Sequence, residues 1–498
     1  MTTMKESKQN DGNEVGSPAM WLPDRRSFVR GIVGLGAMIT SMPEALSARP
    51  IQSQSTAPGG EVPSVGGAWG PFTPSSSFGR YLELAYPASP GAGGLQIAVV
   101  YRMWLPANIQ RVRAVIVHQH GAGIPAAQAG ATSSYDLQWQ ALAKKWDCAL
   151  LGPSYHVLND AIDLTPGGAE LWFDPRKGSN ATFLRALKEL SIQSGYPEIA
   201  TAPWVLWGHS GGGIWSNVMS TLHPERIVAV FLRSGTATMF RTMHEFIQPE
   251  VPPATYGIPT MVNFGMGEKG KRPYDGSLAT FQEYGAQGAP IGFAPDPRTA
   301  HECGDSRYLA IPFLDECLRM RLQESSQGLR PVEKSGSWLA MPFDDTAVAA
   351  ASFKGDPAKA AWLPNEAIAK IWMEYVRTGT VSYSAAPPAP VDVRAKVQPD
   401  GSVRVSWDAE VDYILGLGGF IVLRDGHGIG RLPSNAPDAV FGRPLFQGLS
   451  FHDTPFAQLP QMIHVDSSPQ KKSKHAYTVI VLSSSGVPSK PSPPAVFE

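Results

Sequence analysis

The residues with the clearest potential for chemistry surround Ser210. An apolar run at residues 204–207 has the length and composition of a buried strand, and it ends in the sequence Gly-His-Ser-Gly-Gly at 208–212. Apolar residues then recur with helical spacing over 214–222. A glycine-bounded serine between a strand and a helix is typical of a nucleophile elbow, because the strained turn requires neighbours that lack a Cβ. Such a turn would present the hydroxyl at a helix N-terminus, where backbone N–H groups can stabilise an oxyanion.

The candidate proton acceptor for this serine is His301, in the polar stretch 298–305. This stretch follows the last expected strand, at 291–293, and precedes a helix expected over 307–322. A general base must come within hydrogen-bond reach of the hydroxyl, and loops at the carboxyl ends of parallel strands can achieve that. We therefore predict that His301 is the general base.

An acid that orients the histidine has several candidates. Glu268 comes directly after the strand expected at 260–264, Asp275 lies a few residues further on, and Asp296 is close to His301 in sequence. A carboxylate of either length can hold the imidazole in the required tautomer, so the residue type does not decide between them. Position after the strand favours Glu268, and the other two stay open.

Stabilising an oxyanion requires two backbone donors. One is the N–H of Gly211, the residue after the serine. The other is expected from the His-Gly-Ala-Gly sequence at 120–123, which follows a strand expected at 113–119. Glycine there lets the backbone approach a substrate closely. Gly121 and Ala122 are equal candidates for the second donor.

Aromatic side chains near these positions could bind a substrate. Trp172 and Phe173 fall in a loop after a strand expected at 148–151, and Trp215 comes just after the glycine-bounded serine. Large aromatic residues dominate protein cores, whereas a ligand pocket is lined by a few of them. The three residues are therefore candidates for either role.

The elements that must position these residues alternate between strands and helices. Such alternation predicts an α/β fold with a doubly wound, mostly parallel sheet. The expected strands are 81–86, 95–105, 113–119, 148–151, 204–207, 227–232, 260–264 and 291–293. The expected helices include 135–146, 180–190, 214–222 and 307–322.

The stretch from residue 81 to residue 322 resembles the α/β-hydrolase superfamily in its serine esterase form. The resemblance rests on the glycine-bounded serine at 208–212, on a later acid and a later histidine in that chain order, and on the His-Gly sequence at 120–123. It implies a serine nucleophile, an acyl-enzyme intermediate and no need for a metal or organic cofactor.

The N-terminal segment, residues 1–48, is predicted to direct export. Twin arginines in the sequence Asp-Arg-Arg-Ser-Phe-Val-Arg at 24–30 precede a mildly apolar run at 31–42, and this resembles a Tat signal. The resemblance implies the Tat export machinery as a partner and a periplasmic or extracellular location. The apolar run is too short and glycine-rich for a stable membrane anchor. Residues 49–75 read as a flexible linker.

The chain after the hydrolase-like domain, placed at 76–325, divides again. Residues 326–385 are expected to be a docking segment and linker, with a helix over 365–377. Residues 386–498 resemble a fibronectin type III β-sandwich, with Trp407 as core tryptophan and Tyr477 as corner tyrosine. The long insertion at 428–461 departs from a compact module. The resemblance implies a spacer or substrate-tethering role.

Composition limits the classes of function. A chain of 498 residues is too long for one core, and a net charge of −1 argues against nucleic acid as a partner. The cysteines Cys148, Cys303 and Cys317 fit no metal spacing, so buried thiols with at most one disulfide are expected.

These features favour a secreted serine hydrolase that cleaves carboxylic esters. The substrate would be a small-molecule or polymeric ester, such as a polysaccharide ester or a polyester. A peptidase or acyltransferase of the same fold is one alternative, and a catalytically inactive binding protein is another.

Overall fold

The computed structural model describes residues 78–497 except for a set of short gaps. The gaps are 90, 92, 124–125, 127–129, 131, 157–171, 243–247, 325–327, 435–440, 444, 456–460 and 469–473. The predicted export signal at 1–48 and the linker at 49–75 lie outside the described residues. The domain boundaries stay predictions.

The central element is an eight-stranded sheet with the order β1-β2-β4-β3-β5-β6-β7-β8. Its strands are β1 Gly79–Tyr86, β2 Val99–Pro106, β3 Val115–Gln119, β4 Ala149–Tyr155, β5 Trp204–His209, β6 Ile227–Arg233, β7 Thr260–Gly265 and β8 Ile291–Asp296. The β1/β2 and β2/β4 pairs are antiparallel, and every pair from β4 to β8 is parallel. Strands β3 to β8 are buried along their whole length, as expected for a parallel sheet covered on both faces.

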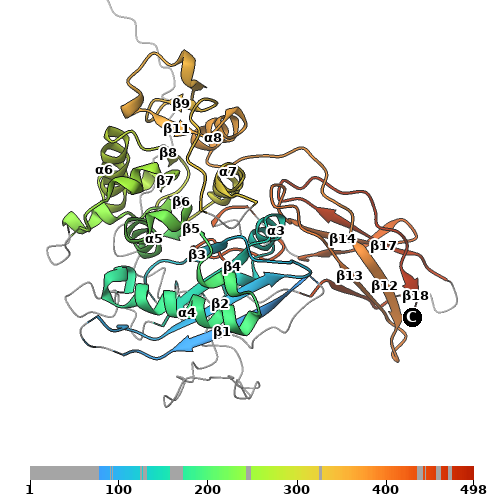
Figure 1. The fold of residues 1–498 in the computed structure, drawn as a ribbon. Coiled ribbons are helices and arrows are strands. Elements are labelled where there is room, and N and C mark those ends of the chain that lie inside the picture. Colours follow the sequence, from blue (N-terminus) through green and yellow to red (C-terminus); the bar gives the residue numbers. More distant parts are fainter. Residues whose placement is uncertain are drawn as a thin grey trace, which may run out of the picture. The chain divides into compact units, whose positions relative to one another are not determined.

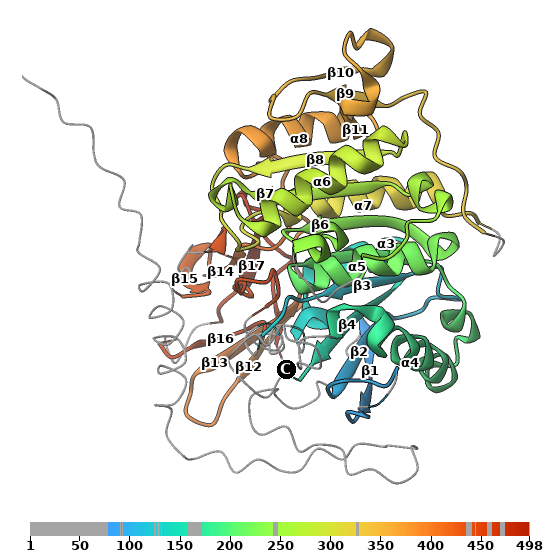
Figure 2. The same ribbon diagram turned by 90° about the vertical axis from the view of Figure 1, so that its left-hand side faces the viewer.

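Helices cover both faces of this sheet. They are α3 Leu137–Lys145, α4 Ser179–Ser194, α5 Gly211–Leu222, α6 Arg272–Ala286, α7 Arg307–Arg321 and α8 Glu366–Thr378. Helices α4, α5 and α6 lie on one side, while α3, α7 and α8 lie on the other (Figure 1), and the turned view places the first group in front (Figure 2). The predicted α/β fold with a doubly wound, mostly parallel sheet is therefore confirmed.

Two strands run at least three residues further than their apolar sequence indicates. Strand β4 continues to Tyr155, and β8 continues to Asp296. The extra residues include polar groups at the carboxyl ends, where a sheet of this kind collects its functional side chains. An apolar run therefore marks the buried middle of such a strand and misses its end.

Strands after the main sheet form three smaller sheets. The order β10-β9-β11 is found beside α8, and the orders β16-β13-β12-β18 and β15-β14-β17 form the C-terminal sheets. Their bounds are β9 Trp338–Ala340, β10 Ala347–Ala349, β11 Ala361–Leu363, β12 Val391–Val397, β13 Val403–Asp408, β14 Gly419–Arg424, β15 His427–Leu432, β16 Ile463–Asp466, β17 Tyr477–Leu482 and β18 Val496–Phe497.

The two C-terminal sheets share one apolar core, which confirms the predicted β-sandwich. Trp407 packs with its ring centroid 5.2 Å from that of Phe420 across the sheets. Tyr477 is fully buried and its hydroxyl donates to the Asp466 carboxylate at 2.8 Å. The assignment to the fibronectin type III class stays a prediction.

Helix α8 packs on the main sheet. The Trp372 indole N–H donates to the carbonyl of Phe293 on β8 at 2.8 Å. The helix ends at Gly379, which takes the left-handed conformation with a φ of 71°. Cys148, Cys303 and Cys317 are buried free thiols. Within the described residues, the helices are too short or too polar to cross a bilayer.

Candidate active site

Ser210 occupies a strained turn between β5 and α5. Its φ of 54° and ψ of −120° lie outside the regions that residues with a Cβ prefer. The turn is held because the Ser210 N–H donates to the carbonyl of Arg233 at 2.8 Å and the Ser210 carbonyl accepts from Ile214 at 3.0 Å. These two hydrogen bonds therefore keep Ser210 in its strained conformation, directly after the last residue of β5.

Glycines around this turn allow backbones to approach closely. A Cβ added to Gly208 would collide with the carbonyl of Gly212, and a Cβ on Gly212 would collide with that of His120. Gly235, at the end of the neighbouring strand, would press a Cβ into the carbonyl of Ser210. The elbow predicted from the sequence is present, and the packing explains why glycines are needed at the end of β5, in the first turn of α5 and just after β6.

The structure brings His301 to Ser210. The loop after β8 carries this histidine, and its Nε2 lies 2.8 Å from the Ser210 hydroxyl oxygen. The imidazole is 31% exposed, so solvent and a substrate can reach it. The serine hydroxyl can donate its proton to this nitrogen.

Glu268 completes the arrangement. It lies at the end of the short 3-10 helix η8 Met266–Glu268, and its Oε1 is 2.5 Å from His301 Nδ1. Its other oxygen accepts from the hydroxyl of Ser234 at 2.6 Å. The carboxylate is buried, with 3% of its side chain exposed. Each carboxylate oxygen of Glu268 therefore has one hydrogen-bond partner, His301 for one and Ser234 for the other.

The other candidate acids lie elsewhere. Asp275 is exposed in the first turn of α6. Asp296 accepts from the Tyr375 hydroxyl at 2.9 Å and from the N–H of Arg298 at 2.9 Å. These bonds commit Asp296 to fixing helix α8 and the turn after β8. Of the three acids, Glu268 is the one hydrogen-bonded to His301.

Candidate oxyanion donors adjoin the serine. A Cβ placed on Gly211 would lie 3.3 Å from the nitrogen of Ala122, and one placed on Gly121 would lie 3.1 Å from the Cβ of Ser210. The loop after β3 therefore borders the start of α5. His120 shapes this loop, because its Nδ1 is 2.5 Å from the Gly121 carbonyl and its Nε2 accepts from Tyr155 at 3.2 Å.

The candidate pocket aromatics are all buried but differ in their neighbours. Phe173 comes within 3.5 Å of a Cβ built on Gly211. Trp172 stacks on Tyr155 with ring centroids 4.3 Å apart. Trp215 points into the core, where its indole N–H donates to Ser179 at 3.2 Å. Phe173 is thus the one whose position borders the serine turn.

Sequence reasoning missed Arg233 and Ser234. Arg233 is fully buried at the end of β6, and its guanidinium donates to Asn263 at 2.9 Å and to Thr299 at 2.7 Å, thereby holding the loop that carries His301. Ser234 has a φ of 51° and supports Glu268. The available signal was a polar pair at the carboxyl end of an apolar strand.

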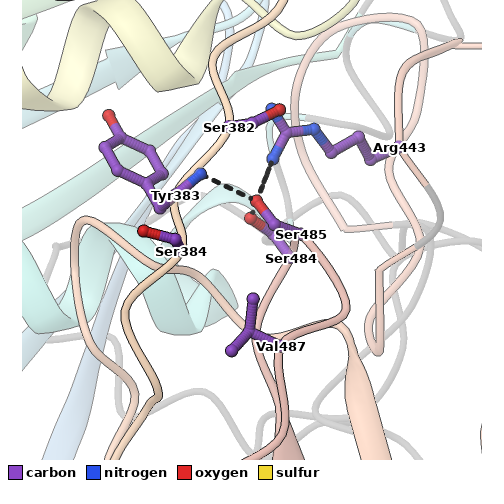
Figure 3. A pocket seen from close by; sticks show the side chains of 7 residues that line it. All are labelled: Ser382, Tyr383, Ser384, Arg443, Ser484, Ser485 and Val487. Atoms are coloured by element: carbon purple, nitrogen blue, oxygen red, sulfur yellow. Dashed lines mark hydrogen bonds between the residues drawn. The ribbon is translucent and has the colours of Figure 1, made fainter.

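One hollow on the molecule lies apart from these residues. It measures about 540 Å³ and is lined by Ser382, Tyr383, Ser384, Arg443, Ser484, Ser485 and Val487. Figure 3 shows the Ser485 hydroxyl accepting from the Arg443 guanidinium and from the N–H of Tyr383, both at 3.1 Å. The polar groups of this hollow therefore bond to one another, and no member of the Ser210 arrangement lines it.

No family model matches the chain. No curated protein matches it either. Solved structures similar to it include a thermostable esterase, at 16% identity and a TM-score of 0.28 over 43% of this chain and 54% of that one. The chain thus spans about half of that esterase.

Two further structures are matched over nearly their whole length. A cold-adapted esterase from an Arctic intertidal metagenomic library has 13% identity and a TM-score of 0.33, over 50% of this chain and 97% of that one. An S-formylglutathione hydrolase from Agrobacterium tumefaciens has 15% identity and a TM-score of 0.33, over 50% and 96%. Likenesses this distant carry no argument about function, which rests on the distances described above.

Proposed function

We propose that this protein is a serine hydrolase that cleaves carboxylic esters, with Ser210, His301 and Glu268 as its catalytic triad. The observation that carries the proposal is the unbroken sequence of contacts from hydroxyl to imidazole to carboxylate, at 2.8 Å and 2.5 Å. These are the distances at which a base can take the serine proton and an acid can hold the base in its tautomer.

In the first half-reaction Ser210 Oγ bonds to the ester carbonyl carbon while His301 Nε2 takes the hydroxyl proton. Glu268 stabilises the imidazolium, and backbone N–H groups of Gly211 and of Gly121 or Ala122 bind the oxyanion. The ester C–O bond then breaks, and the imidazolium gives its proton to the departing alcohol. Water repeats these steps on the acyl-enzyme and releases the carboxylic acid.

Esters are the proposed substrates because this arrangement suffices for them. An alkoxide departs more readily than the nitrogen anion that an unprotonated amide would release, so ester cleavage demands less of the acid that protonates the leaving group. Phe173, beside Gly211, is the proposed wall of the acyl pocket. A polysaccharide ester or a polyester is the proposed polymeric substrate, since the sequence resembles an exported enzyme with an attached β-module.

Fluorophosphonate labelling with peptide mapping tests the nucleophile, and p-nitrophenyl esters test the bond. We expect label on Ser210, hydrolysis of p-nitrophenyl acetate, and loss of both in Ser210→Ala. Label on another residue, or faster turnover of aminoacyl nitroanilides than of esters, would reject the proposal. Ser216→Ala, at a buried serine six residues further along in α5, is the matched control that keeps the nucleophile.

The twin arginines support a further proposal, that the chain is exported by the Tat route. The paired substitution Arg25→Lys with Arg26→Lys keeps the charge and removes the motif. We expect the variant to stay in the cytoplasmic fraction while the parent leaves it, as measured by immunoblotting. Equal export of both proteins would contradict the proposal.

A further inference from the structure

A loop of the C-terminal sandwich contacts the candidate active site. Residues 449–455, called the 449–455 loop, lie in the chain between β15 and β16. The carbonyl of Phe451 accepts a hydrogen bond at 3.0 Å from the N–H of Cys303, and Cys303 comes two residues after His301. The Phe451 ring also lies beside the His301 ring, with centroids 6.1 Å apart. A segment about 150 residues downstream thus borders the histidine loop.

His452 of this loop is the first link in a hydrogen-bonded chain. Its Nδ1 lies 2.8 Å from Nδ1 of His209, and Nε2 of His209 lies 2.7 Å from the carbonyl oxygen of His301. The His452 ring also borders the oxyanion loop, because its Cε1, the carbon next to Nδ1, is 3.4 Å from a Cβ built on Gly121. His452 therefore contacts both sides of the serine turn.

The direction of these hydrogen bonds follows from their partners. A carbonyl can only accept, so Nε2 of His209 carries the proton that it donates to His301. Burial lowers the pKa of His209 well below its ordinary value and lowers that of His452 to about 3, so both rings are neutral near pH 7. A neutral imidazole carries only one N–H, so Nδ1 of His209 has no proton and can only accept. Nδ1 of His452 must therefore donate to it.

We propose that His452 is a positioning residue of the hydrolase site, which holds His209 in the tautomer that ties down the backbone of His301. This inference rests on the proposed function, because the position of that backbone matters to a rate only if His301 transfers protons. Without the donor at His452, His209 can place its proton on Nδ1 and release the His301 carbonyl. The imidazole would then lose its fixed distance to Ser210.

The 449–455 loop is itself anchored, as a positioning element must be. Asp453 is buried and accepts from the Arg307 guanidinium at 2.7 Å, while the same guanidinium donates to Asp136 at 2.6 Å. Arg307 begins α7, directly after the histidine loop, and Asp136 caps α3. The loop is therefore fixed to two helices of the main sheet next to the residue that it positions.

The test compares His452→Leu with His452→Asn in the full chain. Leucine removes the donor, whereas the asparagine side-chain nitrogen can replace Nδ1. We expect leucine to lower kcat for p-nitrophenyl acetate by about 10- to 100-fold, since a misplaced catalytic group costs on that order. KM should change little, and the rate of Ser210 labelling by fluorophosphonate should fall with kcat. Asparagine should restore most of both rates.

His427→Leu is the matched control, because His427 is an exposed histidine of the same sandwich that bonds the Asp425 carbonyl at 3.0 Å. It should match the parent in both rates. An inactive and unlabelled parent chain would reject the proposed function. An active parent whose kcat is unchanged in His452→Leu, or is equally low in both His452 variants, would reject the positioning role alone.

A measurement on the unaltered chain decides the matter if His452→Leu does not fold. Histidine ¹⁵N shifts distinguish the two neutral tautomers, and His452→Asn assigns the His452 signals by their loss. We expect a proton on Nε2 of His209 and on Nδ1 of His452. Protons on the opposite nitrogens would overturn the inference.

Discussion

At the scale of single residues, two serines in strained conformations serve different ends. Ser210 and Ser234 have φ values of 54° and 51°, which residues with a Cβ rarely adopt. The first directs its hydroxyl to His301, and the second directs its hydroxyl to Glu268. The side chains of Ser210, His301, Glu268 and Ser234 form one hydrogen-bonded chain. Its first and last residues are the two strained serines, which follow the neighbouring strands β5 and β6.

Glu268→Gln is predicted to abolish most activity while leaving the fold intact. Glutamine keeps the size of the side chain, but its neutral amide neither stabilises the imidazolium nor enforces the tautomer that donates from Nδ1. We expect kcat to fall by about 10³- to 10⁴-fold with little change in KM, because the lost interaction acts in the transition state. Steady-state kinetics and thermal melting together check this.

Asp275→Asn is the matched control, since Asp275 is exposed on α6 near Glu268 in sequence. It should retain parental kinetics. A loss below tenfold in Glu268→Gln, or an equal loss in the control, would show that another group orients His301.

These residues differ in how far sequence could identify them. Ser210 carries its own local pattern, and His301 stands alone in a polar loop after the last strand of the sheet. Glu268, Asp275 and Asp296 share a type and a neighbourhood, and only the fold separates them, because Asp296 is taken by Tyr375 on a helix about 80 residues later. A bond to a distant element leaves no trace in local spacing.

At the scale of elements, the 449–455 loop joins the sandwich to the main sheet through a buried ionic cluster. Arg307 lies between Asp136 and Asp453, and their side chains are at most 2% exposed. Burial by itself would raise the pKa of Asp453, but the Arg307 guanidinium outweighs it and keeps that pKa below its ordinary value. Removing one carboxylate would leave a buried charge poorly compensated.

Asp453→Ala is therefore predicted to destabilise the chain by about 3–5 kcal/mol, the usual cost of breaking a buried ion pair. Urea unfolding followed by tryptophan fluorescence measures it. Glu410→Ala is the matched control, because the Lys144–Glu410 pair also links α3 to the C-terminal chain but is 44% and 60% exposed. That change should cost at most about 1 kcal/mol. Equal losses in the two variants would contradict the assignment.

The sandwich strands were predictable, but the contact made by this loop was not. Alternating residues over β13 and apolar residues over β14 and β17 mark half-buried and buried strands. The 449–455 loop has neither period, because its residues are held by tertiary bonds to α3, α7 and β5. The long insertion noted in the sequence was the available sign that this stretch does something else.

At the scale of the molecule, catalytic geometry and the C-terminal sandwich depend on each other. The described residues fall within one compact unit. Tyr375 of helix α8 bonds Asp296 at the end of β8, and Phe451 of the 449–455 loop bonds Cys303 in the histidine loop that follows. A module expected to act as a spacer or tether therefore also takes part in the packing around Ser210 and His301.

Acid is predicted to weaken this packing before it protonates the buried carboxylates. Burial lowers the pKa of His120 and His452 from 6.5 to about 3 and that of His156 to about 4. Between those values and 6.5 the unfolded chain binds protons that the folded chain does not, so the free energy of unfolding falls as pH falls through this window. Above about pH 5 the effect mainly reports imidazoles, because unfolded aspartates and glutamates bind protons mainly below that pH.

Urea unfolding at a series of pH values from about 7 to about 5 checks this dependence. We expect the free energy of unfolding to drop steadily, by up to about 1.4 kcal/mol per pH unit for each buried imidazole. His452→Asn removes one such group and should flatten the slope by that of one proton, even if its stability at pH 7 is lower. A slope unchanged by the substitution would mean that His452 takes up no proton on unfolding, and so that the 449–455 loop does not bury a neutral ring against His209.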